Sequence, residues 1–171
     1  SFLIDEFFVS MDFSLNLHYG ANLISFYSLP ENDSVSVVMQ DINDNLTSIV
    51  GEGQGAMYFS DGDYWIGSLT NFDISSGYWL LLTNADTLSG SGYPYNISRE
   101  YNLHQGANLA SFPSVGSFSI TDALPDYVEE NIIAILGEGA ATLNVENTWY
   151  GSLDHFEGLH GYWIITNSAL S

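Results

Sequence analysis

An internal repeat spans most of this chain and constrains its fold more than any other feature. Residues 16–26 (NLHYGANLISF) return as residues 102–112 (NLHQGANLASF), at an offset of 86. The Gly-Glu-Gly sequence of residues 51–53 returns at 137–139 with the same offset, and Gly-Tyr-Trp of residues 77–79 returns at 161–163. Because the order is kept and the offset hardly drifts, the sequence predicts two diverged copies of one domain in tandem.

Each copy has the pattern of a β-rich domain. Residues 7–17 alternate apolar and polar side chains, which predicts a half-buried strand, and residues 93–103 take its place in the second copy. Further strands are expected at 23–26, 47–50, 56–59, 64–69 and 77–83, and at 109–112 in the second copy. A short helix is expected over 35–42 after Ser34 and over 120–127 after Ser119, where Pro125 shortens or kinks it.

The predicted fold is therefore mostly β, either β-sandwich-like or small α+β, with five to six strands and about one short helix in each domain. We expect a first domain at residues 1–92, with an N-terminal docking strand, and a second at 93–171. The Ser-Gly-Ser-Gly sequence of residues 89–92 is interpreted as the linker between them.

The charge of the chain restricts its partners. There are 21 acidic residues against one basic residue, and the formal net charge is −20. Such a polyanion is repelled by nucleic acid and by anionic membrane surfaces, and it attracts divalent cations. The chain has no cysteine, which excludes disulfides and zinc–thiolate sites, and no apolar run of the roughly 18 residues needed to span a bilayer. Since the sequence begins at Ser1, we expect either a removed leader or an excised fragment, and an extracellular or cell-surface location.

Calcium is the metal that these carboxylates favour. Residues 41–52 place oxygen ligands at the spacing of a calcium-binding loop, but Leu46 stands where the sharp turn needs glycine, so an EF-hand is not expected. Asp61-Gly62-Asp63 is a better irregular loop, with a solvated acidic loop as the alternative. The candidate ligands are Asp41, Asn43, Asn45, Glu52, Asp61, Asp63, Glu138 and Glu146.

Glu52 and Glu138 also allow other roles. Each lies in a tight turn and could accept backbone N–H bonds within that turn, help to hold a cation, or serve a hydrolase. Glycoside hydrolysis needs two carboxylates about 5–10 Å apart, and only one carboxylate is retained per copy, so we expect no enzyme. The recurring His18 and His104 lie beside glycine turns and are expected to hydrogen-bond those turns.

Aromatic and glycosylation patterns support two weaker hypotheses. Aromatic residues recur on predicted strands, where they either pack in a core or form sugar-stacking platforms; these are Trp65, Trp149, Tyr78, Trp79, Tyr162 and Trp163. Tyr78 and Trp79 must point to opposite faces, so one of them could be exposed. The sequons at Asn32, Asn45 and Asn96 permit N-glycosylation.

The ends of the chain suggest self-association. Phe2, Leu3 and Ile4 form an apolar segment that is an aggregation risk unless another strand covers it. A C-terminus followed by the N-terminus of another copy resembles the junction between the two domains, and non-closing contacts of this kind produce filaments. Arg99, the only basic residue, is expected either to pair with a carboxylate between domains or chains, or to extend along an edge with its charge in water.

The repeated framework Asn-Leu-His-x-Gly-Ala-Asn-Leu, Gly-Glu-Gly, Trp-x-Gly-Ser-Leu and Gly-Tyr-Trp resembles tandem domains of secreted surface proteins from aquatic bacteria. The chain is also similar to bipartite subunits of calcium-stabilised extracellular fibres. This resemblance implies an extracellular assembly, strand exchange between subunits, bound calcium and surface glycans.

Two functions follow as expectations. The first is a structural subunit of an extracellular filament or surface assembly, in which copies join head to tail by strand complementation and divalent cations stabilise the polymer. The second is a carbohydrate-binding or adhesin module of a larger secreted protein.

Overall fold

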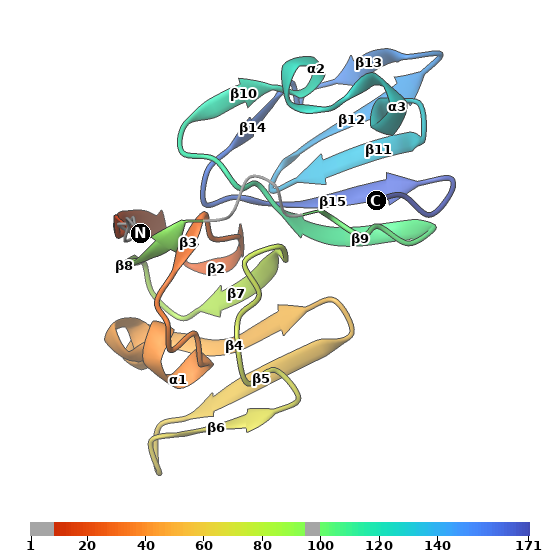
Figure 1. The fold of residues 1–171 in the computed structure, drawn as a ribbon. Coiled ribbons are helices and arrows are strands. Elements are labelled where there is room, and N and C mark those ends of the chain that lie inside the picture. The colour runs from red at the N-terminus through yellow and green to blue at the C-terminus, as the bar shows by residue number, and fades with distance from the viewer. Residues whose placement is uncertain (1–8, 95–99) are drawn as a thin grey trace, which may run out of the picture.

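The computed structural model describes residues 9–94 and 100–171, and it confirms a mostly β fold built from two similar halves. Figure 1 shows the first half in red to light green and the second in green to blue. The elements of the first half are β1 (Met11–Leu17), β2 (Gly20–Ile24), β3 (Ser28–Leu29), α1 (Val35–Val38), the 3₁₀ helix η1 (Gln40–Asn45), β4 (Leu46–Gly51), β5 (Gln54–Phe59), β6 (Tyr64–Gly67), β7 (Tyr78–Leu82) and β8 (Asp86–Pro94). Those of the second half are β9 (Gly106–Ser111), β10 (Ser117–Ser119), α2 (Ile120–Ala123), α3 (Asp126–Glu129), β11 (Ile132–Gly137), β12 (Ala140–Val145), β13 (Thr148–Gly151), β14 (His155–Glu157) and β15 (Gly161–Thr166).

The main sheets of the two halves have the same topology. The first is antiparallel with strand order β2-β7-β4-β5-β6, and the second has the matching order β9-β15-β11-β12-β13. Even the irregularities match, because the register shifts between Leu46 and Ser48 in β4 and between Ile132 and Ala134 in β11. The described residues also form two smaller sheets, with strand orders β1-β8-β3 and β10-β14.

Alternation along the strands separates an inner face from an outer face in each main sheet. Ile49, Tyr78 and Leu80 point inward and are fully buried in the first core. Ile135 and Tyr162 lie in the second core in the same way. The short helices pack on the inner faces, through Val35 of α1 in the first half and Ile120 of α2 in the second.

The helices are shorter than the sequence predicts. The predicted helix at 35–42 is one α-helical turn followed by the 3₁₀ helix η1, and the predicted helix at 120–127 is divided into α2 and α3. Pro125 causes the division, because its extended backbone precedes α3 and it provides no amide hydrogen for continuing α2. The Ser119 side chain caps α2 by accepting a hydrogen bond from the Asp122 amide at 3.2 Å.

The predicted linker at residues 89–92 is not a linker. These residues belong to β8, which pairs with β1 from Met11↔Gly92 to Leu17↔Asp86 and with β3 at Leu29↔Tyr93. A Cβ on Gly90 would lie 2.5 Å from the Phe13 ring, and one on Gly92 would lie 2.1 Å from the Leu29 carbonyl carbon. The glycines therefore allow close packing rather than flexibility.

Within the predicted first strand of the second copy (93–103), residues 95–99 lie outside the described residues, and the described ends differ from expectation. Tyr93 and Pro94 lie in β8 of the first half, and Leu103 forms only an isolated bridge with Leu170. In the first half, the matching Leu17 is held in a full ladder because β8 runs beside it. No helix among the described residues is long and apolar enough to cross a membrane.

Candidate functional site

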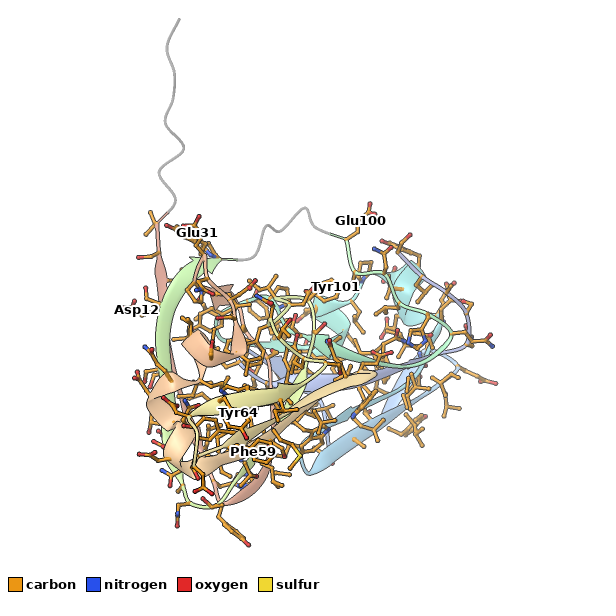
Figure 2. The ribbon with its side chains drawn as sticks, turned by 90° about the horizontal axis from the view of Figure 1, so that it is seen from below. Asp12, Glu31, Phe59, Tyr64, Glu100 and Tyr101 are labelled. Atoms are coloured by element: carbon orange, nitrogen blue, oxygen red, sulfur yellow. The ribbon has the colours of Figure 1, made fainter. Side chains whose placement is uncertain are left out.

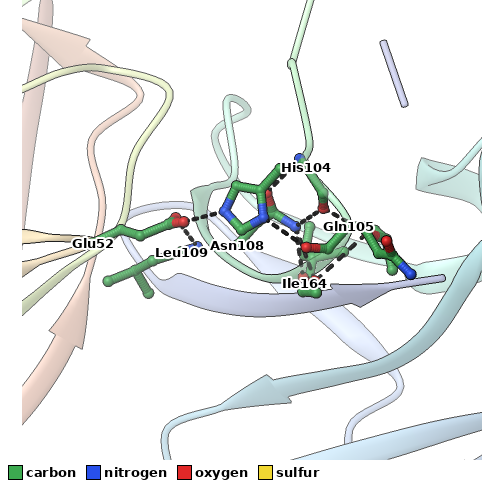
Figure 3. A network of polar contacts seen from close by, with 8 residues as sticks. Glu52, His104, Gln105, Asn108, Leu109 and Ile164 are labelled. Atoms are coloured by element: carbon green, nitrogen blue, oxygen red, sulfur yellow. Dashed lines mark hydrogen bonds and ion pairs between the residues drawn. The ribbon is translucent and has the colours of Figure 1, made fainter. Parts of the chain in front are cut away.

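The recurring Gly-Glu-Gly and His motifs meet at the contact between the two halves. Glu52 lies in the turn between β4 and β5, and its side chain extends to the second half (Figure 3). Its Oε2 accepts a hydrogen bond from the Leu109 amide at 2.8 Å, and its Oε1 contacts Nε2 of His104. The predicted acceptor role of Glu52 within its own turn is thus replaced by a role in the opposite half.

The reverse contact repeats this geometry. Glu138, in the turn between β11 and β12, accepts a hydrogen bond from the Leu23 amide at 2.9 Å through Oε2 and contacts Nε2 of His18 through Oε1. The two contacts, Glu52 with His104 and Glu138 with His18, are hereafter called the reciprocal clasps. Sequence reasoning missed them, although the recurrence of both motifs at one offset of 86 residues is a signal that they act together.

Local hydrogen bonds hold each histidine in place. The His104 amide donates to the Asn108 side-chain oxygen at 2.9 Å, and the Asn108 side-chain amide donates back to the His104 carbonyl at 2.9 Å. His18 and Asn22 make the same pair of bonds, both at 2.9 Å. The predicted structural role of the histidines in their turns agrees with this geometry.

Glycines complete the turns. Gly106 has a φ of 102°, a conformation that side chains rarely adopt, and Gly53 beside Glu52 has a φ of 69°. These glycines therefore allow the turns that present His104 and Glu52 at the contact between the halves.

Both ring nitrogens of each histidine face acceptors. Nδ1 of His104 lies 2.9 Å from the Gln105 carbonyl, and Nε2 faces the Glu52 carboxylate. The pKa of His104 is therefore raised above its ordinary value of 6.5, mainly by the hydrogen bond with the Gln105 carbonyl and next by the contact with Glu52. The Tyr19 carbonyl and then Glu138 raise the pKa of His18 in the same way. Since neither nitrogen is left to take a proton from a substrate, the geometry favours a structural role over a general base.

Backbone contacts extend the interface on both sides of the clasps. The Ser25 amide donates to the Leu159 carbonyl at 2.9 Å, and the Ser111 amide donates to the Ser75 carbonyl at 3.0 Å. The Gly77 amide donates to the Leu109 carbonyl at 3.0 Å. Leu109, on the edge strand β9, therefore has both its amide and its carbonyl occupied by the first half, which protects this edge from other strands.

The glycines of the Gly-Tyr-Trp motif allow this close approach. A Cβ on Gly77 would lie 2.9 Å from the Ala110 carbonyl oxygen, and one on Gly161 would lie 2.6 Å from that of Ile24. Leu159, from the second half, packs in the core of the first and has a φ of 68°. The halves thus share backbone pairing, side-chain contacts and one core residue.

The recurring tyrosines belong to the cores, as one of the sequence interpretations expects. Tyr78 and Tyr162 contact Phe72 and Phe156 edge to face, with ring centroids 4.9 Å apart in both halves. Burial raises the pKa of Tyr162 to about 12. Trp79 is the half-buried member of its pair, on the outer face, so Tyr78 and Trp79 do point in opposite directions.

The tryptophans of β6 and β13 differ in their partners. Nε1 of Trp149 donates to the Glu129 carboxylate. Asn43 stands at the matching position in the first half, and its Oδ1 and the Nε1 of Trp65 are both buried without a hydrogen-bond partner. This polar difference between the halves was not expected from the sequence.

The predicted calcium ligands lie in separate places. Within residues 9–94 and 100–171, no group of three or more His, Asp or Glu side chains is arranged to hold a metal ion. Asp61 and Asp63 lie in the turn between β5 and β6, where Asp63 accepts a hydrogen bond from the Tyr58 hydroxyl at 2.7 Å. Asp41 and Asn43 lie in η1, and Glu146 lies in the turn between β12 and β13. Calcium remains a prediction.

The remaining predicted sites divide between described and undescribed residues. Asn32 is exposed, whereas the Asn45 side-chain nitrogen, to which a glycan would attach, donates to Asp86 at 2.9 Å, and its oxygen accepts from Asn84 at 3.2 Å. The predicted inter-subunit residues Phe2, Leu3, Ile4 and Arg99 and the predicted sequon at Asn96 lie outside the described residues.

Comparisons with protein-family models, with curated proteins and with solved structures gave no match.

Proposed function

We propose that the chain is a structural subunit of an extracellular filament or surface assembly. Copies join head to tail through strand complementation, and divalent cations stabilise the polymer. The reciprocal clasps support this proposal because they join the halves through side chains, backbone pairing and a shared core residue, as a load-transmitting subunit requires.

The observation that carries the proposal is the difference between the halves beside β8. In the first half, β8 lies between β1 and β3 and buries Leu88. Leu29 of β3 is only 7% exposed, whereas Val115, its match in the second half, is 53% exposed. β1 and β8 form a ladder in the first half. At the matching place in the second half, the described residues form one isolated bridge, between Leu103 and Leu170. A strand added beside this bridge would cover the apolar surface that β8 covers in the first half.

The donor that we propose is the N-terminal segment of another copy. Phe2, Leu3 and Ile4 provide the apolar side chains that such a strand needs. The segment lies outside the described residues, so its role rests on the sequence. Divalent cations enter the proposal because contacting copies, each with a formal charge of −20, repel one another unless cations are bound or concentrated between them.

The test is assembly of the purified full chain, followed by negative-stain electron microscopy with calcium and with a chelator. We expect filaments in calcium and their loss in chelator. Deleting residues 1–6 should abolish them, and an added peptide of residues 86–94 should block growth, whereas a scrambled peptide should not. Filaments that survive both the deletion and the peptide would contradict strand complementation, and a chain that stays monomeric in calcium would contradict the assembly function.

A second candidate function is carbohydrate binding at the tip of the β5–β6 hairpin. Phe59 and Tyr64 stack with ring centroids 5.4 Å apart and an interplanar angle of 12°, and both rings are exposed. Figure 2 shows both residues on these strands, away from Glu31 and Asp12. Exposed aromatic faces are the usual platform for sugar rings. Glycan-array binding that is lost in Tyr64→Ala, with the chain remaining monomeric, would favour this function over assembly.

A further inference from the structure

Each main sheet exposes an apolar outer face on the side away from its helices. The first outer face consists of Val50, Met57, Phe59, Ile66, Trp79 and Leu81, and the second consists of Leu136, Leu143, Val145, Tyr150, Trp163 and Ile165. The strand register places these side chains side by side. In the first sheet, Leu81 is opposite Ser48, which is opposite Met57, which is opposite Ile66. At about 4.8 Å per strand, this row alone is roughly 14 Å wide.

The two outer faces are equivalent. In the second sheet, Ile165 is opposite Ala134, which is opposite Leu143, which is opposite Tyr150. Every member of this row matches a member of the first at the repeat offsets, and most have changed identity while remaining apolar. Met57 and Leu143 are each 55% exposed. Contiguous exposed apolar surface of this kind is typical of an interaction site.

Neither outer face carries a carboxylate. The chain has a formal charge of −20, yet no Asp or Glu occupies the positions of the two rows or those of Phe59, Val145 and the two tryptophans. A cationic partner would be attracted to the carboxylate-rich surfaces instead. A second copy of the same polyanion can approach closely only where carboxylates are absent, so the outer faces are the surfaces that suit a homotypic contact.

The outer faces are also continuous with an interface that this chain already makes with itself. Leu23 lies on the first outer side, directly opposite Trp79, and is buried. A Cβ on Gly161, in the other half, would lie 3.0 Å from the Leu23 side chain. Leu109, opposite Trp163, is buried against Gly77 in the same way. At one end of each outer face, a side chain of one half therefore already packs against the other half.

We propose that the two outer faces are lateral docking surfaces for a second copy of this chain, packing sheet against sheet. Because each chain carries two such faces, it can contact two neighbours and extend the assembly sideways. The inference rests on the proposed function in that the partner is a copy of this chain, but it uses a different surface from the strand complementation at Leu103 and Val115.

The test compares the full chain with a face variant in which Met57→Glu and Leu143→Glu place one carboxylate at the centre of each face. The matched control is Val37→Glu with Tyr127→Glu, which adds the same charge at exposed apolar positions of α1 and α3. A second face variant, Met57→Gln with Leu143→Gln, avoids added charge. The melting temperature of each variant establishes folding.

Sedimentation velocity over a concentration series, in calcium buffer, measures self-association, and electron microscopy measures bundling of filaments. We expect the wild type and the control to self-associate and bundle. The Glu face variant should show at least a tenfold weaker association and single, unbundled filaments, and the Gln variant should lie between them. Equal association and bundling of the wild type, the control and the Glu face variant would overturn the proposal, as would binding of the wild type to phosphatidylcholine vesicles without self-association. If the wild type forms face-dependent dimers but no filaments, the docking surfaces stand and the proposed filament function fails.

Discussion

The carboxylate of Glu52 in the first half contacts the imidazole of His104 in the second half. The same carboxylate accepts the Leu109 amide at 2.8 Å, so one side chain satisfies both a ring nitrogen and an edge-strand amide. In the homologous contact, Glu138 of the second half contacts His18 and accepts the Leu23 amide of the first half. Each half therefore supplies a carboxylate to an edge strand of the other.

Removing a clasp carboxylate should destabilise the protein through the amide that it leaves unpaired. For Glu52→Ala, the buried Leu109 amide loses its acceptor, and we expect a loss of about 1–3 kcal/mol in the free energy of unfolding. Urea denaturation measures this loss. The exposed Glu31 serves as the control, and Glu31→Ala should change stability by less than about 0.5 kcal/mol. Equal effects of the two substitutions would contradict the role of Glu52.

The stability contributed by the clasps should decrease as the pH rises. The pKa values of His18 and His104 are raised above 6.5 in the folded state. Their contribution is therefore fully present below the unfolded-state value of about 6.5 and is lost as the pH rises through the folded-state values.

The measurement is the melting temperature between pH 5.5 and 8.5. The difference between the wild type and the double variant His18→Asn with His104→Asn should be largest at the acidic end and shrink toward the alkaline end. The difference in melting temperature between the wild type and the variant Glu52→Gln with Glu138→Gln should shrink toward alkaline pH in the same way. A difference that grows with pH would contradict the assignment.

The glycine of the Gly-Tyr-Trp motif should tolerate no side chain. Gly161→Ala places a Cβ 2.6 Å from the Ile24 carbonyl oxygen, and we expect a destabilisation of about 1–3 kcal/mol. The control is Gly55→Ala, because the matching residue in the second half is Ala141. Thermal unfolding compares the two, and a Gly161→Ala variant as stable as Gly55→Ala would contradict the close approach of the halves.

The glycines of β8 should behave as packing residues. Gly92→Ala places a Cβ 2.1 Å from the Leu29 backbone, and we expect a loss of at least about 1–3 kcal/mol. The exposed Ser91→Ala should be nearly neutral. Two variants of equal stability in urea denaturation would favour the flexible linker that the Ser-Gly-Ser-Gly sequence predicts.

The sequence predicts the repeat and the β-rich class because both depend on local pattern. Alternation identifies the region of β1, and the adjacent positions of Tyr78 and Trp79 on a predicted strand place them on opposite faces. β8 could not be predicted, because Gly90 and Gly92 have the composition of a linker, and only the close approach of Phe13 and Leu29 shows that these glycines pack in a strand.

The clasps were also beyond local reasoning. Glu52 and His104 are 52 residues apart, and nothing in either motif specifies a partner in the other half. The expected turn hydrogen bonds are correct for His104, which bonds with Gln105 and Asn108. None of the three roles considered for Glu52 included a contact with the other half, where its carboxylate meets His104 and Leu109.

Amide hydrogen exchange, resolved by NMR, tests the reciprocal clasps most directly. The Leu23 and Leu109 amides lie on edge strands, and each has a carboxylate from the opposite half as its acceptor. We predict that both are protected in the wild type, and that Glu52→Ala removes protection from Leu109 while Leu23 stays protected. A Leu109 amide that exchanges equally fast in the wild type and in Glu52→Ala would contradict the account.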